Sequence, residues 1–575
     1  MKLTRLFLSQ DLTIVQSVSR LVFRINILLI TVTSLTLRIL VPPNPVYNSV
    51  HDDQLMVKMA NGILKSGWIG DYSEVGHLLT SKPPGYAMFL AYTHFLPWAP
   101  TVTIHSLLLV GFLVFLREVR GFGATRGLAT FVYVMLAFFP VWFNEPMSRI
   151  YREGLLTALA SVTLGAGLWL ARVISDGITT QKDDRQIYMK VVLTSSLVGM
   201  SVGIFIITKP SWHFLVVFIL SLFAATVFAN WTTHQLRQTM KILSMSIITI
   251  FATLLIPISF VLYKNHQVFG FYGLDNFSQG SYSEAMKNLY SIKDKLNRPY
   301  IDVTKQMRHE AYKVSPTMAK LRPFLELPDG QGWRYQPCVT PLKVCDESGA
   351  WFPWEFRDAV ENAGLGDSAV EFNSTFSKIA TEIERGCQTK KIECESRGLA
   401  VGLDSFDSLS TRVVVDSFAL GTQSLLDPLL GFQQRGEAIG LSVDTIKLWE
   451  STVRNLPPRS FATDYRSGTT FLSDTRLTIG KLYNSFWTLI ILVGISGNLL
   501  LVGRKSQKIN QNQIIGLGLL CSIAISLMQI SVLEASNGFF MTSGANLYLV
   551  PVFPFLLASV IFGLVKWFTL IDKRR

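Results

Sequence analysis

Acidic and basic side chains gather at the ends of apolar runs, at four places that are far apart along the chain: Asp52 and Asp53; Lys82; Glu145, Arg149, Arg152 and Glu153; and Lys209. Charged groups at the boundary of a bilayer are costly and usually functional. In such a group a carboxylate can act as a base on an acceptor hydroxyl, while Lys or Arg neutralises an anionic leaving group such as a lipid phosphate. Each residue taken singly can equally mark a loop end or an interfacial anchor, and only their joint placement favours a site.

The composition places these residues in a membrane protein. Of the 575 residues 49% are hydrophobic and 16% are charged, and the mean hydropathy is +0.34, which is outside the range of a soluble globular chain. The formal net charge of +13 could indicate nucleic-acid binding. However, Lys and Arg fall in small groups between apolar runs, so we interpret the excess as a topology signal and expect no nucleic-acid partner.

Ten apolar runs predict a mainly α, polytopic transmembrane protein. They lie near residues 21–41, 101–116, 127–143, 154–174, 190–207, 211–229, 242–263, 484–502, 513–533 and 547–570. The first run is long enough to cross a bilayer of about 30 Å. It is followed by Pro42-Pro43-Asn44-Pro45 and no small-residue cleavage site, which favours an uncleaved first span over a signal peptide.

The basic residues predict the orientation. With the N-terminus in the cytoplasm, the strongly basic short connections all fall on the cytoplasmic face, including those around Arg117, Arg172 and Arg504 and the terminal Lys573-Arg574-Arg575. The segment 83–97 has only about fourteen apolar residues and predicts an interfacial or re-entrant helix. The loops 42–100, 144–153 and 264–483 then face the exterior, which predicts a plasma or inner membrane protein whose site faces the periplasm or exterior.

Residues 264–483 predict a separate, mostly helical extracytoplasmic domain between two transmembrane modules, 1–263 and 484–575. Four of the five cysteines lie there, as Cys338 with Cys345 and Cys387 with Cys394. In an oxidising compartment two local disulfides are the simplest interpretation, although four cysteines permit three connectivities. Zinc is the alternative, but the spacing within each pair is wider than is usual for a zinc site.

Five short motifs occur in order along the transmembrane part: His51-Asp52-Asp53 with Ala60, Lys82-Pro83-Pro84, Thr208-Lys209-Pro210, Lys264-Asn265-His266 with Phe269-Gly270, and Tyr548-Leu549-Val550-Pro551. Together they resemble the GT-C membrane glycosyltransferases, in particular relatives of the protein O-mannosyltransferases and of the aminoarabinose transferases that modify lipid A. The resemblance does not extend to residues 271–480. It implies a GT-C architecture of about 10–12 spans.

The resemblance also implies roles. Asp52 would be the base that deprotonates or orients the acceptor, Glu153 (or, less favoured, Glu145) a second acidic residue, and Asp53 either a partner of Asp52 or a helix cap. The donor would be a polyprenyl-phosphate sugar, transferred with inversion to a lipid, glycan or protein acceptor. Its phosphate would be held by basic residues at five positions, which are Lys82, Lys209, Arg149, Arg152 and Lys264.

Two departures from the family pattern change that assignment. Leu547 stands where the family has Arg before the final Tyr-Leu-x-Pro, and Lys264 and His266 replace Arg and Tyr in the fourth motif. Phosphate binding must therefore rest more heavily on Lys82, Lys209 and Lys264. The resemblance implies no cofactor, although Asp52, Asp53 and Glu153 could hold a divalent metal.

Two other function classes remain open. A multispanning permease or a flippase for lipid-linked sugars predicts inverted repeats and spans broken in corresponding halves. The two halves of this sequence are dissimilar, and one long polar region interrupts the second half only. A polysaccharide polymerase or ligase would share the lipid-linked donor, but it would lack the Asp pair after the first span.

Overall fold

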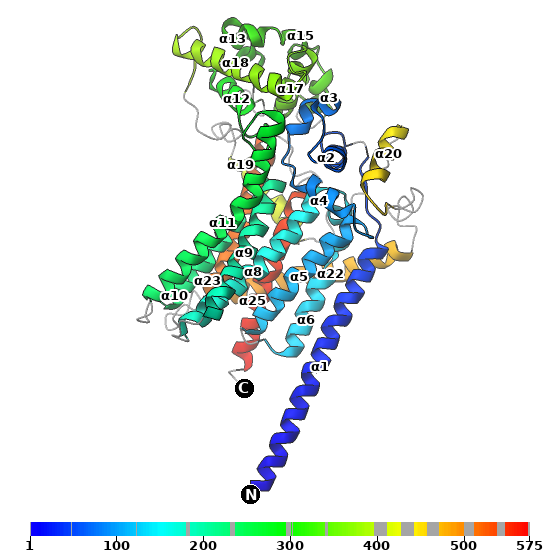
Figure 1. Cartoon of the computed structure of the whole chain (residues 1–575), viewed down its shortest axis with the longest axis vertical. Coiled ribbons are helices and arrows are strands. Elements are labelled where there is room, and N and C mark those ends of the chain that lie inside the picture. The colour runs from blue at the N-terminus through cyan, green and yellow to red at the C-terminus, as the bar shows by residue number, and fades with distance from the viewer. Residues whose placement is uncertain are drawn as a thin grey trace.

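The computed structural model describes residues 2–47, 49–121, 124–179, 185–230, 236–294, 301, 303–339, 343–395, 411–426, 442–456, 471–499, 511–537 and 547–572. Within these ranges the chain is helical, with two isolated β-bridges and no strand. This confirms the predicted mainly α, polytopic class. Figure 1 shows the long helices side by side, with the shorter helices gathered at one end of the bundle.

Nine helical segments of the described residues are long and apolar enough to cross a membrane. They are formed by α1 (Lys2–Leu40), α5 (Pro100–Gly121), α6 (Arg126–Ala137) with η2 (Pro140–Phe143), α8 (Arg152–Thr179), α9 (Arg185–Thr208), α11 (Leu236–Phe269), α22 (Phe471–Leu499), α23 (Gln511–Asn537), and η6 (Val550–Val552) with α25 (Phe553–Asp572). The remaining predicted run, 211–229, forms α10 (His213–Asn230), whose apolar part, His213–Phe228, is shorter. All ten predicted apolar runs are therefore helical.

Small residues let the central spans approach one another. A Cβ on Gly111 of α5 would lie 2.5 Å from the backbone of Ser161 on α8, and one on Gly199 of α9 would lie 2.4 Å from the Ile250 carbonyl oxygen on α11. Neither separation is possible between real atoms, so both contacts require glycine. α8 is the most enclosed of these helices, together with the last span. α8 thus packs closely against α5 and α9 within the bundle.

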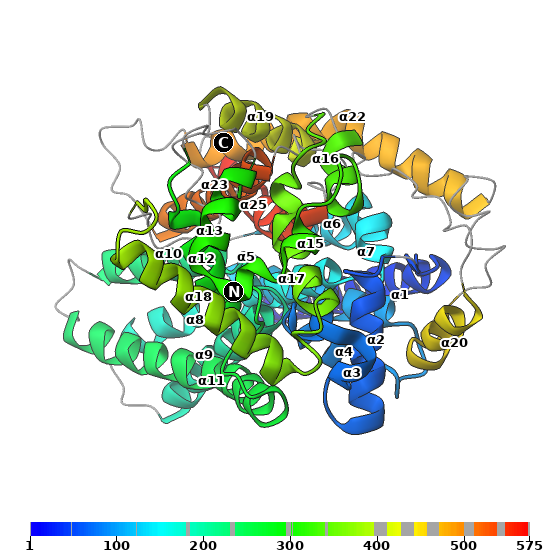
Figure 2. The ribbon, with the colours of Figure 1, turned by 90° about the horizontal axis from the view of Figure 1, so that it is seen from above.

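The loop between α1 and α5 folds over the upper end of the bundle in Figure 1. It contains α2 (Asp53–Ser66), α3 (Tyr72–Val75), η1 (Gly76–Thr80) and α4 (Gly85–Thr93), which Figure 2 shows gathered on one side of the molecule. α4 has nine residues, about half of what a span needs. It packs against α2, so the non-spanning interpretation of segment 83–97 agrees with the structure.

The polar segment between α11 and α22 is helical where it is described. It comprises α12 (Ser281–Ser291), α13 (Lys305–Val314), α14 (Pro316–Ala319), α15 (Arg322–Leu325), η3 (Gly332–Arg334), α16 (Tyr335–Val339), η4 (Gly349–Trp351), α17 (Phe352–Asn362), α18 (Ala369–Gln388), α19 (Thr411–Leu426) and α20 (Val443–Thr452). Tyr282, Phe356 and Phe376 are buried between α12, α17 and α18. The predicted boundary at residue 264 falls inside α11, which continues to Phe269.

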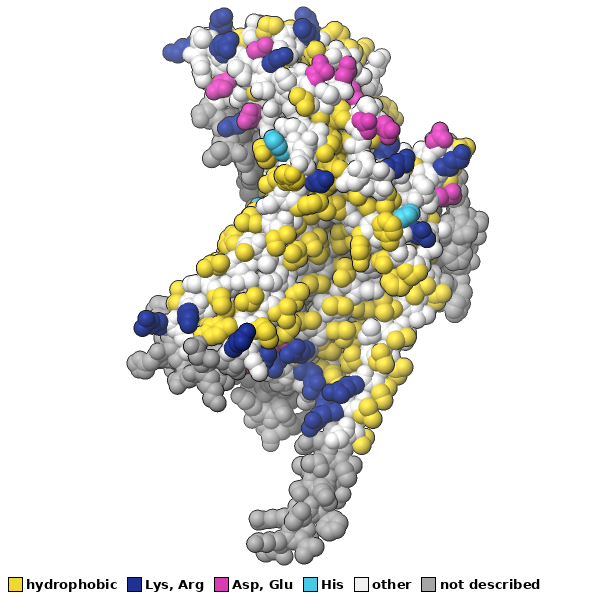
Figure 3. Space-filling view, viewed as in Figure 1, with side chains coloured by type: hydrophobic (Ala, Val, Ile, Leu, Met, Phe, Trp, Pro, Cys, Tyr) yellow, Lys and Arg dark blue, Asp and Glu magenta, His cyan; other side chains and the backbone are white. Residues whose placement is uncertain are grey.

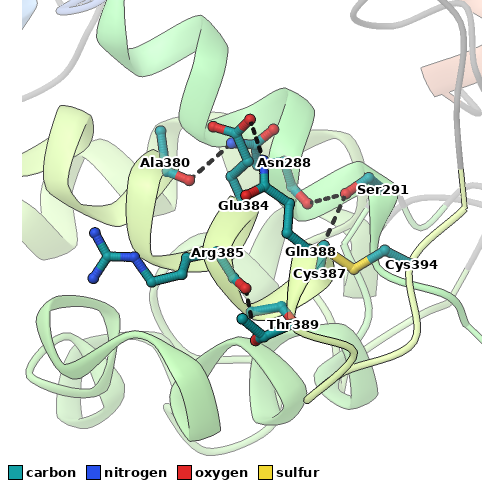
Figure 4. The surroundings of a disulfide bond; sticks show 10 residues. Asn288, Ser291, Ala380, Glu384, Arg385, Cys387, Gln388, Thr389 and Cys394 are labelled. Carbon is teal, nitrogen blue, oxygen red and sulfur yellow. Dashed lines mark hydrogen bonds between the residues drawn. A yellow bond between two sulfur atoms is a disulfide. The ribbon is translucent and has the colours of Figure 1, made fainter.

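Both predicted disulfides are present, as Cys338–Cys345 and Cys387–Cys394. The second joins the C-terminal end of α18 to Cys394, which forms a β-bridge with Ile292 at the end of α12 (Figure 4). There the Ser291 hydroxyl donates to the Asn288 carbonyl at 2.7 Å, and the Asn288 amide donates to the Ala380 carbonyl at 2.8 Å. The remaining cysteine, Cys521, is free.

The polar segment is docked onto the loop that carries the acidic pair. The Asn276 side-chain amide donates to the Thr80 hydroxyl at 2.6 Å, and the Arg357 guanidinium donates to the His77 carbonyl at 2.5 Å. His77 also contacts Asp358 at 3.0 Å. These polar contacts hold α17 against η1.

The surface agrees with a membrane-embedded bundle. Figure 3 shows a broad band of hydrophobic side chains over the long helices, with Lys and Arg grouped at its lower end and Asp and Glu on the polar segment. The large exposed apolar side chains include Leu28 and Leu29 on α1, and Ile248 and Phe251 on α11. Arg504 and the terminal Lys573-Arg574-Arg575, on which the predicted orientation partly rests, lie outside the described residues.

Candidate active site

The acidic pair lies at the start of α2. Asp52 is the N-cap residue, but its carboxylate accepts no capping hydrogen bond, and Asp53 is the first helical residue. A carboxylate is favourable at this end of a helix because the helix dipole is positive there. The helix buries Leu55, Met56 and Met59 and ends at Gly67, which adopts the left-handed conformation with φ 77°. Both carboxylates are thus available to side chains from elsewhere in the chain.

Asp53 binds Arg149. The guanidinium Nε donates to Oδ1 of Asp53 at 2.7 Å, and a second nitrogen donates to Oδ2. The Asp53 side chain is fully buried and that of Arg149 is 5% exposed. Because the two form a bidentate pair, Asp53 fixes Arg149 in one orientation, and it does so from the first turn of α2, where the sequence places it as a helix-start carboxylate.

Arg149 lies in the loop between α6 and α8, which includes α7 (Glu145–Ser148). The Asn44 N–H donates to the Ser148 carbonyl at 2.7 Å. The buried Arg38 of α1 reaches the same loop, since it donates to the Ser148 hydroxyl at 3.2 Å and to the Trp142 carbonyl at 3.3 Å. Arg38 was not singled out in the sequence, although an arginine near the end of an otherwise apolar run is a visible signal.

Asp52 accepts from two groups that come from different loops. The Lys82 ammonium donates to Oδ1 of Asp52, and the Tyr151 hydroxyl donates to the same oxygen at 2.8 Å. Lys82 also lies 3.4 Å from the Tyr151 oxygen. The Asp52 side chain remains 39% exposed, in contrast to the fully buried Asp53. Of the two carboxylates, only Asp52 can therefore touch a substrate.

Tyr151 is the centre of the site, and the sequence analysis missed it. Its ring is approached by the cationic groups of Arg149 at 4.8 Å, Arg152 at 5.2 Å and Lys82 at 5.6 Å from the centroid. A tyrosine flanked by arginines, as in Arg149-Ile150-Tyr151-Arg152, could have pointed to it, because cations favour aromatic faces. Burial raises the pKa of Tyr151, so its hydroxyl keeps its proton and donates to Asp52.

The start of α8 and the end of α9 complete the site. Glu153 is fully buried, and the Lys209 ammonium donates to its Oε1 at 3.0 Å. Arg152 lies 3.7 Å from the same oxygen. Lys209 also lies over the Tyr548 ring, 4.0 Å from its centroid. Leu547 stands at the position where the family has its arginine. The ring of the next residue, Tyr548, is the one that contacts Lys209.

We define the charged cluster as Asp52, Asp53, Lys82, Arg149, Tyr151, Arg152, Glu153 and Lys209. These residues come from the four places along the chain that the sequence singled out, and a continuous series of contacts joins them. Four cations face three carboxylates. The cluster therefore has an excess positive charge that suits an anionic ligand.

Burial and pairing oppose each other in this cluster. Burial raises the pKa of Asp53 to about 6, while Arg149 counteracts the rise, so Asp53 remains ionised at neutral pH. Burial also lowers the pKa of Lys82 to about 8, although Asp52 favours its charged form. The pKa of Asp52 is lowered because the contributions of Lys82 and Tyr151 exceed that of burial. At neutral pH the ion pairs are intact.

Two candidates from the sequence take different positions. Lys264 lies on α11, and within the described residues it forms no ion pair with the cluster. Its neighbour Asn265 is the buried residue there, since it accepts from Trp68 at 3.2 Å and donates to the Gly273 carbonyl at 2.7 Å. Glu145 lies at the start of α7, and its carbonyl accepts from the Arg149 N–H at 2.8 Å.

Aromatic side chains of the polar segment surround His51, the residue before Asp52. The His51 ring lies 5.2 Å from the Trp333 ring and 5.1 Å from the Trp354 ring, measured between centroids. Trp333 stacks at 5.9 Å on Trp351. All three indoles are partly exposed. A partly open aromatic surface thus adjoins the accessible carboxylate of Asp52.

No family model matches the chain, and no curated protein matches it. Two solved structures resemble it. The apo structure of ArnT from Cupriavidus metallidurans is 13% identical, with 96% of this chain and 78% of that chain covered and a TM-score of 0.31. The structure of the same protein bound to undecaprenyl phosphate is 12% identical, with 95% and 77% covered and a TM-score of 0.30. Both are GT-C fold glycosyltransferase structures, the group that the motifs resemble.

Proposed function

We propose that this protein is an inverting membrane glycosyltransferase that moves a sugar from a polyprenyl-phosphate donor to an acceptor hydroxyl. The observation that carries the proposal is the accessible carboxylate of Asp52, which Lys82 and Tyr151 hold at the edge of a cationic cluster. A base beside phosphate-binding cations at a membrane boundary provides the groups that this reaction requires. The motif resemblance supports the same class.

The donor phosphate is held by the cations of the cluster. Lys82, Arg152 and Lys209 converge from three different segments, and all three are connected through Tyr151 or Glu153. A polyprenyl chain is apolar and can remain in the bilayer while its phosphate reaches the boundary. Each carboxylate in the cluster is already paired with a cation, so the proposal assigns the phosphate's charge to Lys and Arg.

Asp52 needs to lose a partner before it can act as a base. A carboxylate whose pKa is lowered by an ammonium group accepts a proton poorly. When the donor phosphate binds, it competes with Asp52 for Lys82, and transfer of Lys82 to the phosphate raises the proton affinity of Asp52. Donor binding in this way activates the base, and the site stays inactive while it is empty.

The chemical step then involves one bond made and one broken. The acceptor oxygen attacks the anomeric carbon from the face opposite the phosphate, while Asp52 takes the hydroxyl proton. The bond between the anomeric carbon and the phosphate oxygen breaks, and its electrons leave with the polyprenyl phosphate. Lys82, Arg152 and Lys209 stabilise the charge that develops on this leaving group.

Two acidic residues act as positioning residues in this scheme. Glu153 is fully buried and binds Lys209, and Asp53 is fully buried and binds Arg149. Neither reaches a substrate, so each sets the position of a cation. This role differs from the direct catalytic role that the family resemblance implies for Glu153.

The aromatic surface around His51 favours a sugar over other phosphate-linked groups. Sugar-binding sites commonly use the faces of Trp side chains because the C–H groups of a pyranose pack on them. Trp333 and Trp354 lie next to His51, one residue from the base. The acceptor or the donor sugar can pack there in the course of transfer.

The proposal also sets the cellular arrangement. The chain is an integral, multi-pass membrane protein. The positive-inside rule puts the end of the bundle that bears Arg117, Arg120 and Arg172 in the cytoplasm. The charged cluster lies at the opposite end, so transfer takes place on the periplasmic or exterior face of the plasma or inner membrane.

A direct assay tests this function. Purified protein in detergent is incubated with a panel of radiolabelled polyprenyl-phosphate sugars and with lipid, glycan and protein acceptor fractions from the source membranes. Label is expected to move from one donor to one fraction, with release of polyprenyl phosphate. If label never moves, but vesicles that contain the protein carry the intact lipid-linked sugar across the bilayer, the flippase alternative is correct.

A further inference from the structure

A second basic site lies at the other end of the bundle, between α1, α5 and α8. It is a cavity of about 510 Å³ lined by Arg24, Arg117, Arg120 and Arg172 together with apolar side chains, and we name it the arginine pocket. Figure 3 shows the group of Lys and Arg side chains at this lower end of the apolar band. The proposed transferase function uses none of these residues.

The arginines exceed the carboxylates that face them. Glu118 is fully buried and accepts from Arg172 at 3.2 Å, with Arg117 at 3.6 Å, while the exposed Asp176 lies 3.9 Å from Arg172. Within the described residues Arg24 and Arg120 pair with no carboxylate. The pocket therefore carries an excess positive charge at the depth of a bilayer headgroup region, where an unpaired cation attracts an anion.

Aromatic rings hold two of the guanidinium groups in place. Arg117 lies over the Trp169 ring at 5.0 Å, and Arg120 lies over the Phe23 ring at 4.7 Å, measured to the centroids. Arginines that only orient the helices need no such support, since they can extend into water. Two guanidinium groups that lie over aromatic rings at the edge of a cavity, with the Arg117 side chain still 60% exposed, are suited to binding a phosphate.

The remaining walls are apolar and lead into the bilayer. Phe23, Ile27, Leu113 and Leu116 line the pocket. Beside it, α1 exposes Leu21, Ile25 and Leu28, whose exposed fractions are 58%, 45% and 62%. A ligand that fits has a negatively charged head and apolar chains that follow α1. Inorganic phosphate would leave this apolar wall without a partner.

We propose that the arginine pocket binds an anionic glycerophospholipid of the cytoplasmic leaflet. Arg24, Arg117 and Arg120 bind its phosphate, and its acyl chains lie along α1. The bound lipid joins α1 to α5 and α8, and it adds contacts to a first span of whose most apolar stretch only 11% is buried. This proposal is independent of the transferase function.

Native mass spectrometry of the whole protein in detergent tests it. The probes are dioleoyl phosphatidylglycerol, dioleoyl phosphatidylcholine, undecaprenyl phosphate and inorganic phosphate. The test variant is Arg117→Gln with Arg120→Gln, and the matched control is Arg185→Gln with Arg237→Gln, which removes two exposed arginines from the same end but outside the pocket. Ile27→Trp is a further variant that fills part of the cavity and removes no charge.

The wild type is expected to retain phosphatidylglycerol at least tenfold more tightly than phosphatidylcholine. The Arg117→Gln, Arg120→Gln variant is expected to lose about thirtyfold in affinity, equivalent to about 2 kcal/mol. Ile27→Trp is expected to weaken retention in the same direction, and the control to match the wild type. Undecaprenyl phosphate binding is expected to be the same in all of them.

Four outcomes would overturn the proposal. The first is equal retention of the two phospholipids, and the second is equal loss in the test and control variants, which would mean that only total charge matters. The third is displacement of phosphatidylglycerol by inorganic phosphate at similar concentration, which would mean that the pocket recognises the phosphate group and not the acyl chains. The fourth is loss of undecaprenyl phosphate together with phosphatidylglycerol in the test variant. If the double arginine variant does not fold, Ile27→Trp replaces it in the comparison with the control, and unchanged retention of phosphatidylglycerol by Ile27→Trp would overturn the proposal.

Discussion

The bundle has a basic site at each end, and the two differ in how their cations are paired. In the charged cluster every carboxylate is bound by a cation, and the excess positive charge is small. In the arginine pocket Arg117 and Arg172 pair with one buried carboxylate, that of Glu118, while Arg24 and Arg120 pair with none among the described residues. An ion pair fixes its side chains in positions set by the fold. An unpaired cation is neutralised only when a ligand supplies the opposite charge.

The difference fits two kinds of task. A reaction needs a base and phosphate-binding groups in a fixed geometry before the substrate arrives, which buried ion pairs provide. A structural lipid site needs only net attraction and an apolar wall. We propose that the same residue types serve catalysis at one end and lipid binding at the other.

Removal of one carboxylate from each site is expected to give the largest difference between the two sites. Asp53→Asn leaves Arg149 buried without an ionic partner, and we expect a loss of about 3–5 kcal/mol in stability. Glu118→Gln is the matched change in the pocket, where Arg172 is 38% exposed, and we expect about 1 kcal/mol or less because solvent screens that charge. Unfolding of the two variants in detergent micelles measures both. Equal losses would contradict the distinction between paired and unpaired sites.

The pH dependence of donor binding separates lysine from arginine. Burial lowers the pKa of Lys82 to about 8, so Lys82 loses its charge as the pH rises through that value. We expect the donor Kd to rise by up to about tenfold per pH unit above 8. In the Lys82→Arg variant, and for phospholipid retention in the arginine pocket, we expect no such rise, because arginine stays charged. A flat profile in the wild type would show that Lys82 does not bind the phosphate.

The lowered pKa of Lys82 also affects folding stability, which is expected to rise with pH where donor affinity falls. Because the folded-state pKa of Lys82 is below that of a free lysine, the unfolded chain binds more protons between about pH 8 and 10.5. This group therefore adds stability as the pH rises through that window. The comparison of wild type with Lys82→Arg, in unfolding experiments from pH 7 to 10, isolates its contribution.

Tyr151→Phe removes only the hydroxyl that donates to Asp52 at 2.8 Å. We expect about a tenfold fall in kcat, because one hydrogen bond to a charged group is lost, and little change in the donor KM. The ring and its contacts with three cations remain. Single-turnover measurements at saturating donor distinguish this result from a binding defect, which would appear as a raised KM at constant kcat.

Lys264→Ala is expected to have the smallest effect. Lys264 has no ion pair with the cluster among the described residues, so we expect less than about a twofold change in donor KM. Lys209→Ala is its matched comparison, since Lys209 contacts Glu153 and Tyr548, and we expect a KM at least tenfold higher. Similar donor KM values for the two variants would show that Lys264 contributes to phosphate binding.

Much of this architecture could be predicted from the sequence, because apolar runs and cysteine spacing are local signals. The ten helical runs and both disulfides are present as predicted. Asp52, Lys82 and Lys209 could be grouped because topology puts them at one end of the bundle. The identity of each partner could not be predicted, since pairing Asp53 with Arg149 requires the three-dimensional position of α2.

Tyr151 and the arginine pocket were missed for related reasons. Tyr151 carries no charge at neutral pH, so a search for charged residues passes over it. Arg24, Arg117 and Arg172 were interpreted as topology signals, and only the packing of α1 against α5 and α8 reveals a cavity between them. Trp333 and Trp354 lie far from His51 in the sequence, in a segment for which no resemblance was found.

The central claim is that Asp52 is the base and that it is not needed for donor binding. The most direct measurement compares Asp52→Asn with wild type in the same detergent preparation, for both donor affinity and transfer of label. Glu74→Gln, an exposed carboxylate of the same loop, is the control. We predict that Asp52→Asn binds donor at least as tightly as wild type, since Lys82 is released, and transfers label about 10²–10⁴-fold more slowly. Transfer at the wild-type rate by Asp52→Asn would contradict the account.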